Sequence, residues 1–227
     1  MEKCGKTKRL YRVIFVLIVG IGLLIHMKDQ NLAGFVNSIS YFTILSNIMC
    51  FCVLLYSAVK RNAHASKRFN LVYGGALLSI TLTFFVYSFV LANSDFTMRA
   101  MENVTFDNGD ILVHYLVPAI MWVDFLWIMP HRIFLKEYIT KWLIIPVIYF
   151  IITMIKAYGY NYFSISEEFK RYPYDFLNIE VNGVPYLISY VGLFTLLCIG
   201  IGIGICVLDF VRGMIYTKKV CANIKQT

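Results

Sequence analysis

Residues 13 to 25 read VIFVLIVGIGLLI, an apolar run without a charged side chain. Basic residues come directly before it, at Lys3, Lys6, Lys8, Arg9 and Arg12. A basic segment followed by an apolar run is also typical of a secretory signal peptide, but no small-x-small cleavage pattern follows, only the polar stretch 26–29. We therefore interpret the run as a retained first transmembrane helix.

Five further apolar runs of similar length follow. The expected spans are residues 10–27, 39–59, 70–92, 111–129, 140–158 and 185–209, each about as long as a membrane-crossing helix. Of the 227 residues, 59% are hydrophobic and 15% charged, and the mean hydropathy is +0.68. This surplus of apolar residues is more than a water-soluble core would bury. The sequence predicts an all-α protein, one six-helix transmembrane domain over residues 1–227.

The basic residues lie between the apolar runs and orient the bundle. Of 21 Lys and Arg, five fall in residues 1–12, four in 60–68, three in 132–141 and four in 212–225. These connections are on the same side of a six-span bundle, and cytosolic loops carry the excess of Lys and Arg, so both termini are expected in the cytosol. The net charge of +8 comes from basic residues between apolar runs and not from a basic stripe on a soluble domain, so no nucleic-acid partner is expected.

The second expected span begins with the stretch YFTILSN at 41–47. Thr43 and Asn47 are four residues apart and share one helical face, with Ser46 beside them. Small hydroxyl and amide side chains commonly join membrane helices through hydrogen bonds. The same residues are also candidates for chemistry, because polar groups at membrane depth are costly and often functional.

The fourth expected span contains His114 one turn before Pro118, whose ring nitrogen leaves the histidine's carbonyl oxygen without its helical donor. Asp110 lies one turn outward on the same face, where its carboxylate would fix one tautomer of the imidazole. Two simpler interpretations stay open. Asp110 is also suited to a helix N-cap, and His114 to a position at the membrane interface.

Depth brings Thr43 and His114 to the same level. Both helices run inward, which puts Thr43 about 6 Å and His114 about 5 Å below the outer boundary. A hydroxyl and an imidazole at one depth are suited to act as nucleophile and general base, because a neutral alcohol needs an acceptor for its proton. His26 reaches the same level on the first helix and is the alternative base.

Other charged residues in the apolar runs have less direct interpretations. Asp124 lies about 15 Å deeper than His114 and on another face, so we expect it to satisfy a neighbouring helix or to belong to a proton path. Asp209 is expected to pair with Arg212 at the inner end of the sixth helix. Lys156, near the outer end of the fifth helix, would receive a lipid carboxylate or extend its amine to the headgroups.

Three short motifs together resemble one membrane protein family. They are YFTILSN at 41–47, HYLVP at 114–118 with DFL at 124–126, and YPYDFL at 172–177 followed by Gly183. In their order and placement the chain resembles the bacterial six-pass relatives of the androgen-induced-gene membrane proteins. Animal members of that family are threonine hydrolases that cleave fatty acid esters of hydroxy fatty acids with an intramembrane Thr and His.

The resemblance implies a lipid-ester hydrolase with Thr43 as nucleophile and His114 as base. In such a hydrolase, we expect Asn47 or Ser46 to orient the nucleophile or the oxyanion and Asp110 to support His114. The implied partner is a membrane lipid or lipid ester, and the implied location is the bacterial plasma membrane, as a multi-pass protein. No cofactor or metal is expected. Two alternatives remain: a transporter or channel in which Asp124, Asn47 and His114 line a polar path, or a membrane assembly protein without chemistry.

Overall fold

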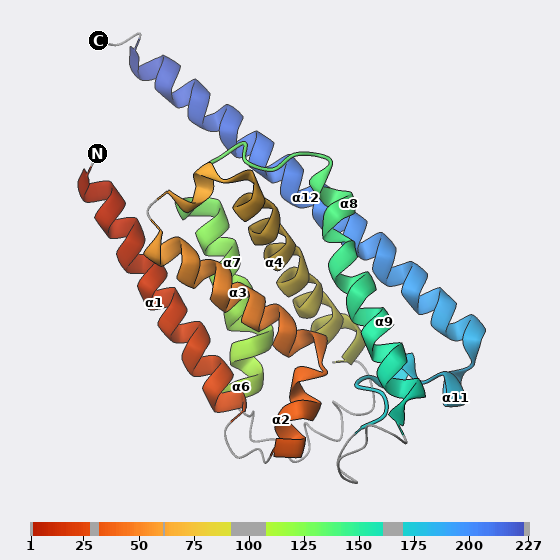
Figure 1. The fold of residues 1–227 in the computed structure, drawn as a ribbon. Helices are drawn as coiled ribbons and strands as arrows, with labels where there is room; N and C mark the ends of the chain where they lie inside the picture. The colour runs from red at the N-terminus through yellow and green to blue at the C-terminus, as the bar shows by residue number, and fades with distance from the viewer. Residues whose placement is uncertain (1, 28–31, 61, 92–107, 161–169, 225–227) are drawn as a thin grey trace.

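Six helices in the structure are long and apolar enough to cross a membrane, which confirms the predicted all-α six-helix bundle. The computed structural model describes residues 2–27, 32–60, 62–91, 108–160 and 170–224 (Figure 1). Within these residues the candidate spans are Thr7–His26, Phe42–Val59, Lys67–Val90, Gly109–Ile128, Tyr138–Tyr158 and Val184–Lys218. The protein is therefore an integral, multi-pass membrane protein by its fold.

The spans are built from the following elements. The first is α1 (Glu2–His26); α2 (Leu32–Ile39) precedes the second, α3 (Phe42–Val59); η1 (Ala63–Ala65) leads to the third, α4 (Lys67–Val86) with η2 (Tyr87–Leu91). The fourth combines α6 (Asn108–Ile111), η3 (Leu112–Leu116), α7 (Val117–Val123) and η4 (Asp124–Ile128). The fifth is α8 (Tyr138–Trp142) with α9 (Ile144–Tyr158), and η5 (Asp175–Leu177) and α11 (Ile179–Asn182) precede the sixth, α12 (Val184–Ile224).

Several helix boundaries differ from those expected, among them the start of the first helix, which begins at Glu2 rather than near residue 10. The second span begins at Phe42 rather than near residue 39, because the chain turns at Ser40 and is extended at Tyr41 (φ −85°, ψ 134°). The sixth helix continues past residue 209 to Ile224. No proline follows Asp209, and a helix that satisfies its own backbone continues into water until its sequence breaks it.

The third span lies at the centre of the bundle. In its most apolar 18-residue segment, 72% of the residues are buried inside the bundle. The corresponding share is 17% for the first and fifth spans and 22% for the sixth, so these three spans expose most of their apolar residues to lipid. Gly74 and Gly75 of α4 let α8 approach closely. A Cβ on Gly74 would lie 2.1 Å from the Trp142 side chain. The indole of Trp142 donates to the Leu71 carbonyl oxygen at 2.8 Å and so joins α8 to α4.

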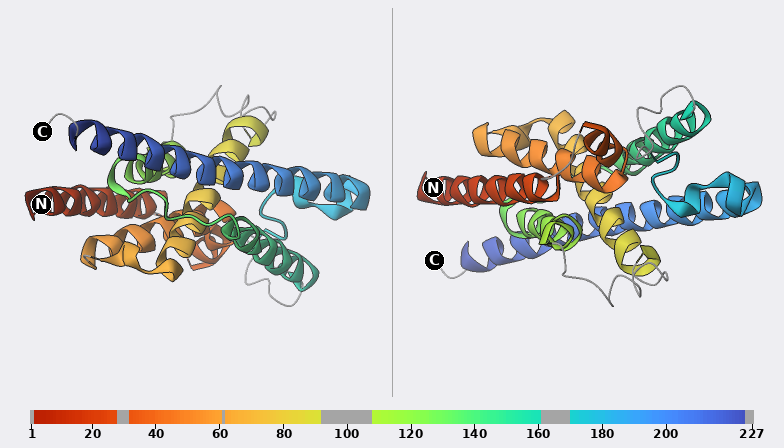
Figure 2. Two further views of the ribbon diagram at one scale, coloured as in Figure 1. Left: turned by 90° about the horizontal axis from the view of Figure 1, so that it is seen from above. Right: turned by 90° about the horizontal axis from the view of Figure 1, so that it is seen from below.

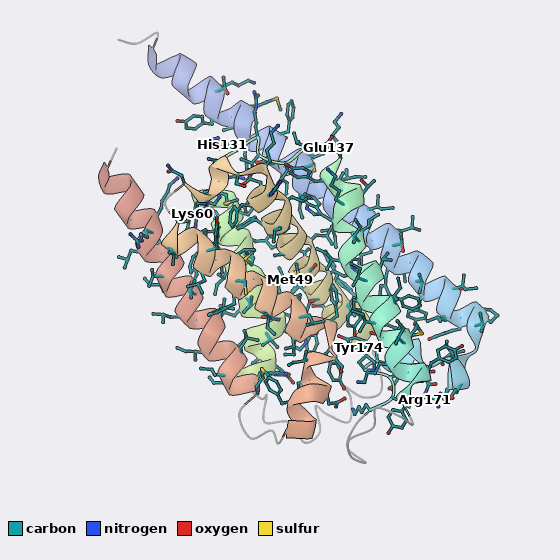
Figure 3. All side chains as sticks on the ribbon, in the orientation of Figure 1. Met49, Lys60, His131, Glu137, Arg171 and Tyr174 are labelled. Carbon is teal, nitrogen blue, oxygen red and sulfur yellow. The ribbon has the colours of Figure 1, made fainter. Side chains whose placement is uncertain are left out.

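Both termini lie at the same end of the bundle, called the inner end below (Figure 1). Lys60 and His131 are at this end, whereas Arg171 and Tyr174 are at the opposite, outer end (Figure 3). The shared end agrees with the even number of spans. The charge distribution predicts that this end faces the cytosol.

A buried ion pair joins three spans near the inner end. Asp124 is fully buried and accepts from Arg12 Nε at 2.9 Å and from the Tyr73 hydroxyl at 2.7 Å. Arg12 also contacts the Met129 sulfur at 3.4 Å. A buried carboxylate needs a counter-charge and hydrogen bonds, and here α1 and α4 supply both. Asp124 thus satisfies neighbouring helices, one of the two roles expected for it.

A second carboxylate fixes the loop before α8. Asp209 accepts from the backbone amides of Arg132 at 3.0 Å, Ile133 at 2.7 Å and Phe134 at 3.0 Å. The expected pairing with Arg212 is also present, at 3.5 Å. Three amide donors to one carboxylate fix this loop to α12.

The orientation leads to a labelling prediction. In a cysteine-free background, a cysteine replacing exposed Val181 should react with a membrane-impermeant maleimide on intact cells, because α11 is expected outside. A cysteine replacing exposed Lys218 should react only after the cells are opened. The reverse pattern would invert the bundle.

The ion pair leads to a stability prediction. Asp124→Asn should lower the free energy of unfolding in detergent by about 3 kcal/mol, because it leaves the Arg12 guanidinium buried without its counter-charge. The matched control is Glu137→Gln at an exposed position, which should change the value by less than about 0.5 kcal/mol. Equal stabilities for the two variants would show that the pair does not hold the bundle.

Candidate functional site

Thr43 is the second residue of α3, which begins directly after the extended residue Tyr41. The first amides of a helix have no partner within the helix and carry the positive end of its dipole. Thr43 is 9% exposed, so its hydroxyl is withdrawn from bulk solvent. Thr43 therefore combines a buried hydroxyl with nearby backbone amides that have no hydrogen-bond partner within the helix.

Two tyrosine phenols lie against this turn. The Tyr174 phenol lies close enough to interact with the Thr43 side chain and with the backbone of Phe42 and Thr43. Tyr149 interacts with the Phe42 backbone and donates to the Ser40 carbonyl oxygen at 2.9 Å. Burial raises the pKa of Tyr174 above its ordinary value. The interactions with Thr43 act in the opposite direction but are smaller than the effect of burial. The Tyr174 phenol is therefore protonated at neutral pH and remains a hydrogen-bond donor.

The Thr43 side chain lines an apolar cavity of about 340 Å³, called the threonine cavity below. It lies among α3, α4, η5, α9 and α12, and most of its wall is aliphatic or phenyl surface. The hydroxyl-bearing residues in its lining are Thr43, Thr83, Tyr87, Tyr149, Tyr174 and Thr195. The helices α9 and α12 separate toward their outer ends (Figure 2). An apolar cavity with a few hydroxyls is suited to an alkyl chain that carries one polar group.

His114 lies on a π-helical turn of the fourth span. The Val117 amide bonds to the Leu112 carbonyl oxygen five residues back, just before Pro118, which has no amide to donate. The imidazole is 7% exposed, and its Nδ1 lies 2.9 Å from the Asp110 carbonyl oxygen. Because a carbonyl only accepts, Nδ1 carries the proton, which leaves Nε2 of the neutral ring as an acceptor.

The amide of Asn47 joins the two candidate catalytic turns. Its Nδ2 donates to the Thr43 carbonyl oxygen at 2.8 Å and to the Val113 carbonyl oxygen at 3.1 Å. The second and fourth spans are therefore in contact beside His114. Asn47 Oδ1 is buried and has no donor among the described residues, and such unsatisfied acceptors in a native structure call for an explanation such as a bound water.

Thr43 and His114 do not face the same cavity. The threonine cavity is lined by Tyr87, and His114 is not among its lining residues. The Tyr87 ring stacks on the imidazole, with ring centroids 3.8 Å apart and planes at 21°. Tyr87 therefore contacts both the threonine cavity and the His114 imidazole, and its ring lies between them.

The remaining sequence candidates fall into three groups. Ser46 joins α3 to α4, donating to the Thr43 carbonyl oxygen at 2.8 Å and contacting the Thr83 hydroxyl at 2.9 Å. Asp110 holds His114 through its backbone, not through its carboxylate, which lies 3.5 Å from His26 Nδ1. Asp110 also lies inside α6 and is not its N-cap. Asp124 and Lys156 belong to other places, the inner ion pair and the wall of a second cavity.

Sequence reasoning assigned no functional role to Tyr87, Tyr149 and Tyr174. Tyr174 lies in the YPYDFL motif, which contributes to the family resemblance. Helical periodicity cannot predict that Tyr174, which lies in a loop, contacts the start of α3 on another span. The YPYDFL motif is therefore the one sequence signal for this residue. Tyr87 and Tyr149 carry no sequence signal, because aromatic residues are common throughout this chain.

Comparison with known proteins found no matching family model, curated protein or solved structure. The class that the fold defines is a helical multi-pass membrane protein, and the site within it is an apolar cavity beside a buried threonine.

The Asn47 bridge leads to a prediction. Asn47→Leu removes two hydrogen bonds between buried groups and should lower the free energy of unfolding by about 1 kcal/mol, since such bonds in membranes average about 0.6 kcal/mol. Unfolding in detergent measures the loss. Ser57→Ala is the matched control, because among the described residues the Ser57 hydroxyl bonds only to the Leu54 carbonyl oxygen of its own helix. A loss no larger than that of the control would contradict a bridge between the spans.

Proposed function

We propose that the protein hydrolyses an ester of an apolar lipid, with Thr43 as the nucleophile and His114 as the general base. The observation that carries the proposal is the position of Thr43, a buried residue that lines an apolar cavity and lies in the N-terminal turn of a helix. A membrane-dissolved ester would place an alkyl chain in this cavity and its carbonyl carbon near the hydroxyl. Withdrawal from water strengthens the polar interactions at the reacting atoms.

The chemistry proceeds in two balanced steps. The Thr43 hydroxyl oxygen bonds to the ester carbonyl carbon, its proton passes to His114 Nε2, and the alkoxide leaves with that proton as an alcohol. Water then attacks the acyl carbon and gives a proton to the same nitrogen. The bond from that carbon to the threonine oxygen breaks, and His114 returns the proton to this oxygen, which releases a carboxylic acid and restores the hydroxyl. The protonated Tyr174 phenol and the first amides of α3 would donate to the oxyanion in both steps.

The proposal requires Tyr87 to move. Its ring is stacked on His114 and forms the cavity wall on that side, so proton transfer needs this ring displaced when the ester enters. Tyr87 is the first residue of the π-helical turn η2, and such turns occur frequently at functional sites.

A polar path for a transported solute has less support. Asn47 and Asp124 are fully buried. The Nδ2 group of Asn47 donates to two carbonyl oxygens, and the Asp124 carboxylate is paired with Arg12 and Tyr73. Neither residue lines a described cavity. These residues therefore favour helix association over conduction.

The activity prediction is tested with purified protein and a long-chain ester. Thr43→Ala and His114→Ala should each lower the hydrolysis rate by at least about a hundredfold, because one removes the nucleophile and the other its base. The double variant should be little worse than either single variant, since the two residues act as one unit. Thr43→Ser should retain part of the activity because it keeps the hydroxyl.

The matched control is Thr195→Ala. Thr195 lines the same cavity, but its hydroxyl donates to the Val191 carbonyl oxygen of its own helix at 2.7 Å, so its loss should leave the rate within a few-fold. A fluorophosphonate probe should label the wild type and the control but not Thr43→Ala. Undiminished hydrolysis by Thr43→Ala would refute the threonine mechanism.

A further inference from the structure

A second apolar cavity lies between α3 and α9, on the other side of Phe42 from the threonine cavity. It measures about 370 Å³ and is called the lysine groove below. Its apolar lining includes Leu45, Met49, Ile145, Ile148 and Ile152. Phe42 and Tyr149 line both cavities and form the wall between them, with ring centroids 5.1 Å apart.

One end of the lysine groove carries a cation and a hydroxyl. Lys156 lines the groove, and its Nζ donates to the Ser40 hydroxyl oxygen at 2.9 Å. Lys156 lies in the last turn of the fifth span, and Ser40 lies just before α3, so both mark the outer end of the groove. The aliphatic residues extend from this end toward the membrane interior. The groove is therefore polar and cationic at the interface and apolar along its length.

This arrangement complements an anionic single-chain amphiphile. A long-chain carboxylate places its charged group at the membrane interface and its alkyl chain in the apolar layer. An ammonium group and a hydroxyl both bind a carboxylate, the first by charge and the second as a hydrogen-bond donor.

We propose that the lysine groove binds a long-chain carboxylic acid, with its carboxylate on Lys156 and the Ser40 hydroxyl and its chain along the aliphatic walls of α3 and α9. The volume is near the lower end of the range of about 300–1,000 Å³ for small-molecule sites, which suits one alkyl chain better than the two of a phospholipid. The single lysine likewise matches one carboxylate.

The position of the groove connects it to the threonine cavity. Ester hydrolysis at Thr43 would release a carboxylic acid on one face of the Phe42–Tyr149 wall, and the lysine groove receives such an acid on the other. This connection, as a product site, rests on the proposed function. Binding of the acid does not, because it needs neither Thr43 nor His114.

The test uses the full chain in nanodiscs of zwitterionic phospholipid and a fluorescent polyene fatty acid as the probe. The wild type should bind the acid at least about tenfold more tightly than its methyl ester, which lacks the charge. Lys156→Met should remove this preference, and Lys156→Arg should keep most of it. Equal affinity for acid and ester in the wild type would overturn the proposal without any variant.

Two controls separate the possible outcomes. Thr43→Ala should bind the acid like the wild type. A wild type that prefers the acid but hydrolyses no ester would refute only the hydrolase proposal, and a wild type that hydrolyses esters without preferring the acid would refute only the acid site. Phosphatidylglycerol added to the nanodiscs should not displace the probe. Full displacement would assign the lysine to a phospholipid headgroup and overturn the proposal. If Lys156→Met does not fold, the acid-to-ester ratio of the wild type and of Lys156→Arg decides.

Discussion

The carboxylate of Asp124 accepts hydrogen bonds from Arg12 and Tyr73 in the interior of the bundle, and this contact joins the first, third and fourth spans. In lipid an unpartnered charge costs several kcal/mol, so the three helices are held in the one arrangement that satisfies it. That arrangement places α4 at the centre. With α4 fixed, α3 and the fourth span pack against it from neighbouring sides, and the outer ends of these helices form the site.

Local departures from regular helix accompany the polar residues of the fourth span. His114 and Asp124 each lie on a π-helical turn, and Tyr87, which stacks on His114, begins another. A π turn inserts one residue into the helix and rotates the residues that follow relative to those before it. Helical periodicity alone therefore misplaces the side chains beyond such a turn.

The two cavities give the outer half of the bundle an organisation that suits lipid chemistry. One has hydroxyls and backbone donors at the start of α3, and the other has a cation near the interface, with Phe42 and Tyr149 between them. Asn47 and Ser46 connect the start of α3 to the fourth and third spans. Their bonds fix the position of Thr43, because a helix start that shifted would lose hydrogen bonds on two neighbours at once.

The sequence by itself determined the number of spans and their approximate bounds, because hydropathy depends only on the order of residues. It also indicated the pairing of Asp209 with Arg212, which are close in the chain. Only the tertiary structure decided that Arg12 is the partner of Asp124, that Tyr174 reaches Thr43, and that Tyr87 stands against His114. Those contacts join residues far apart in sequence, and they depend on how the helices rotate and pack, which no single segment encodes.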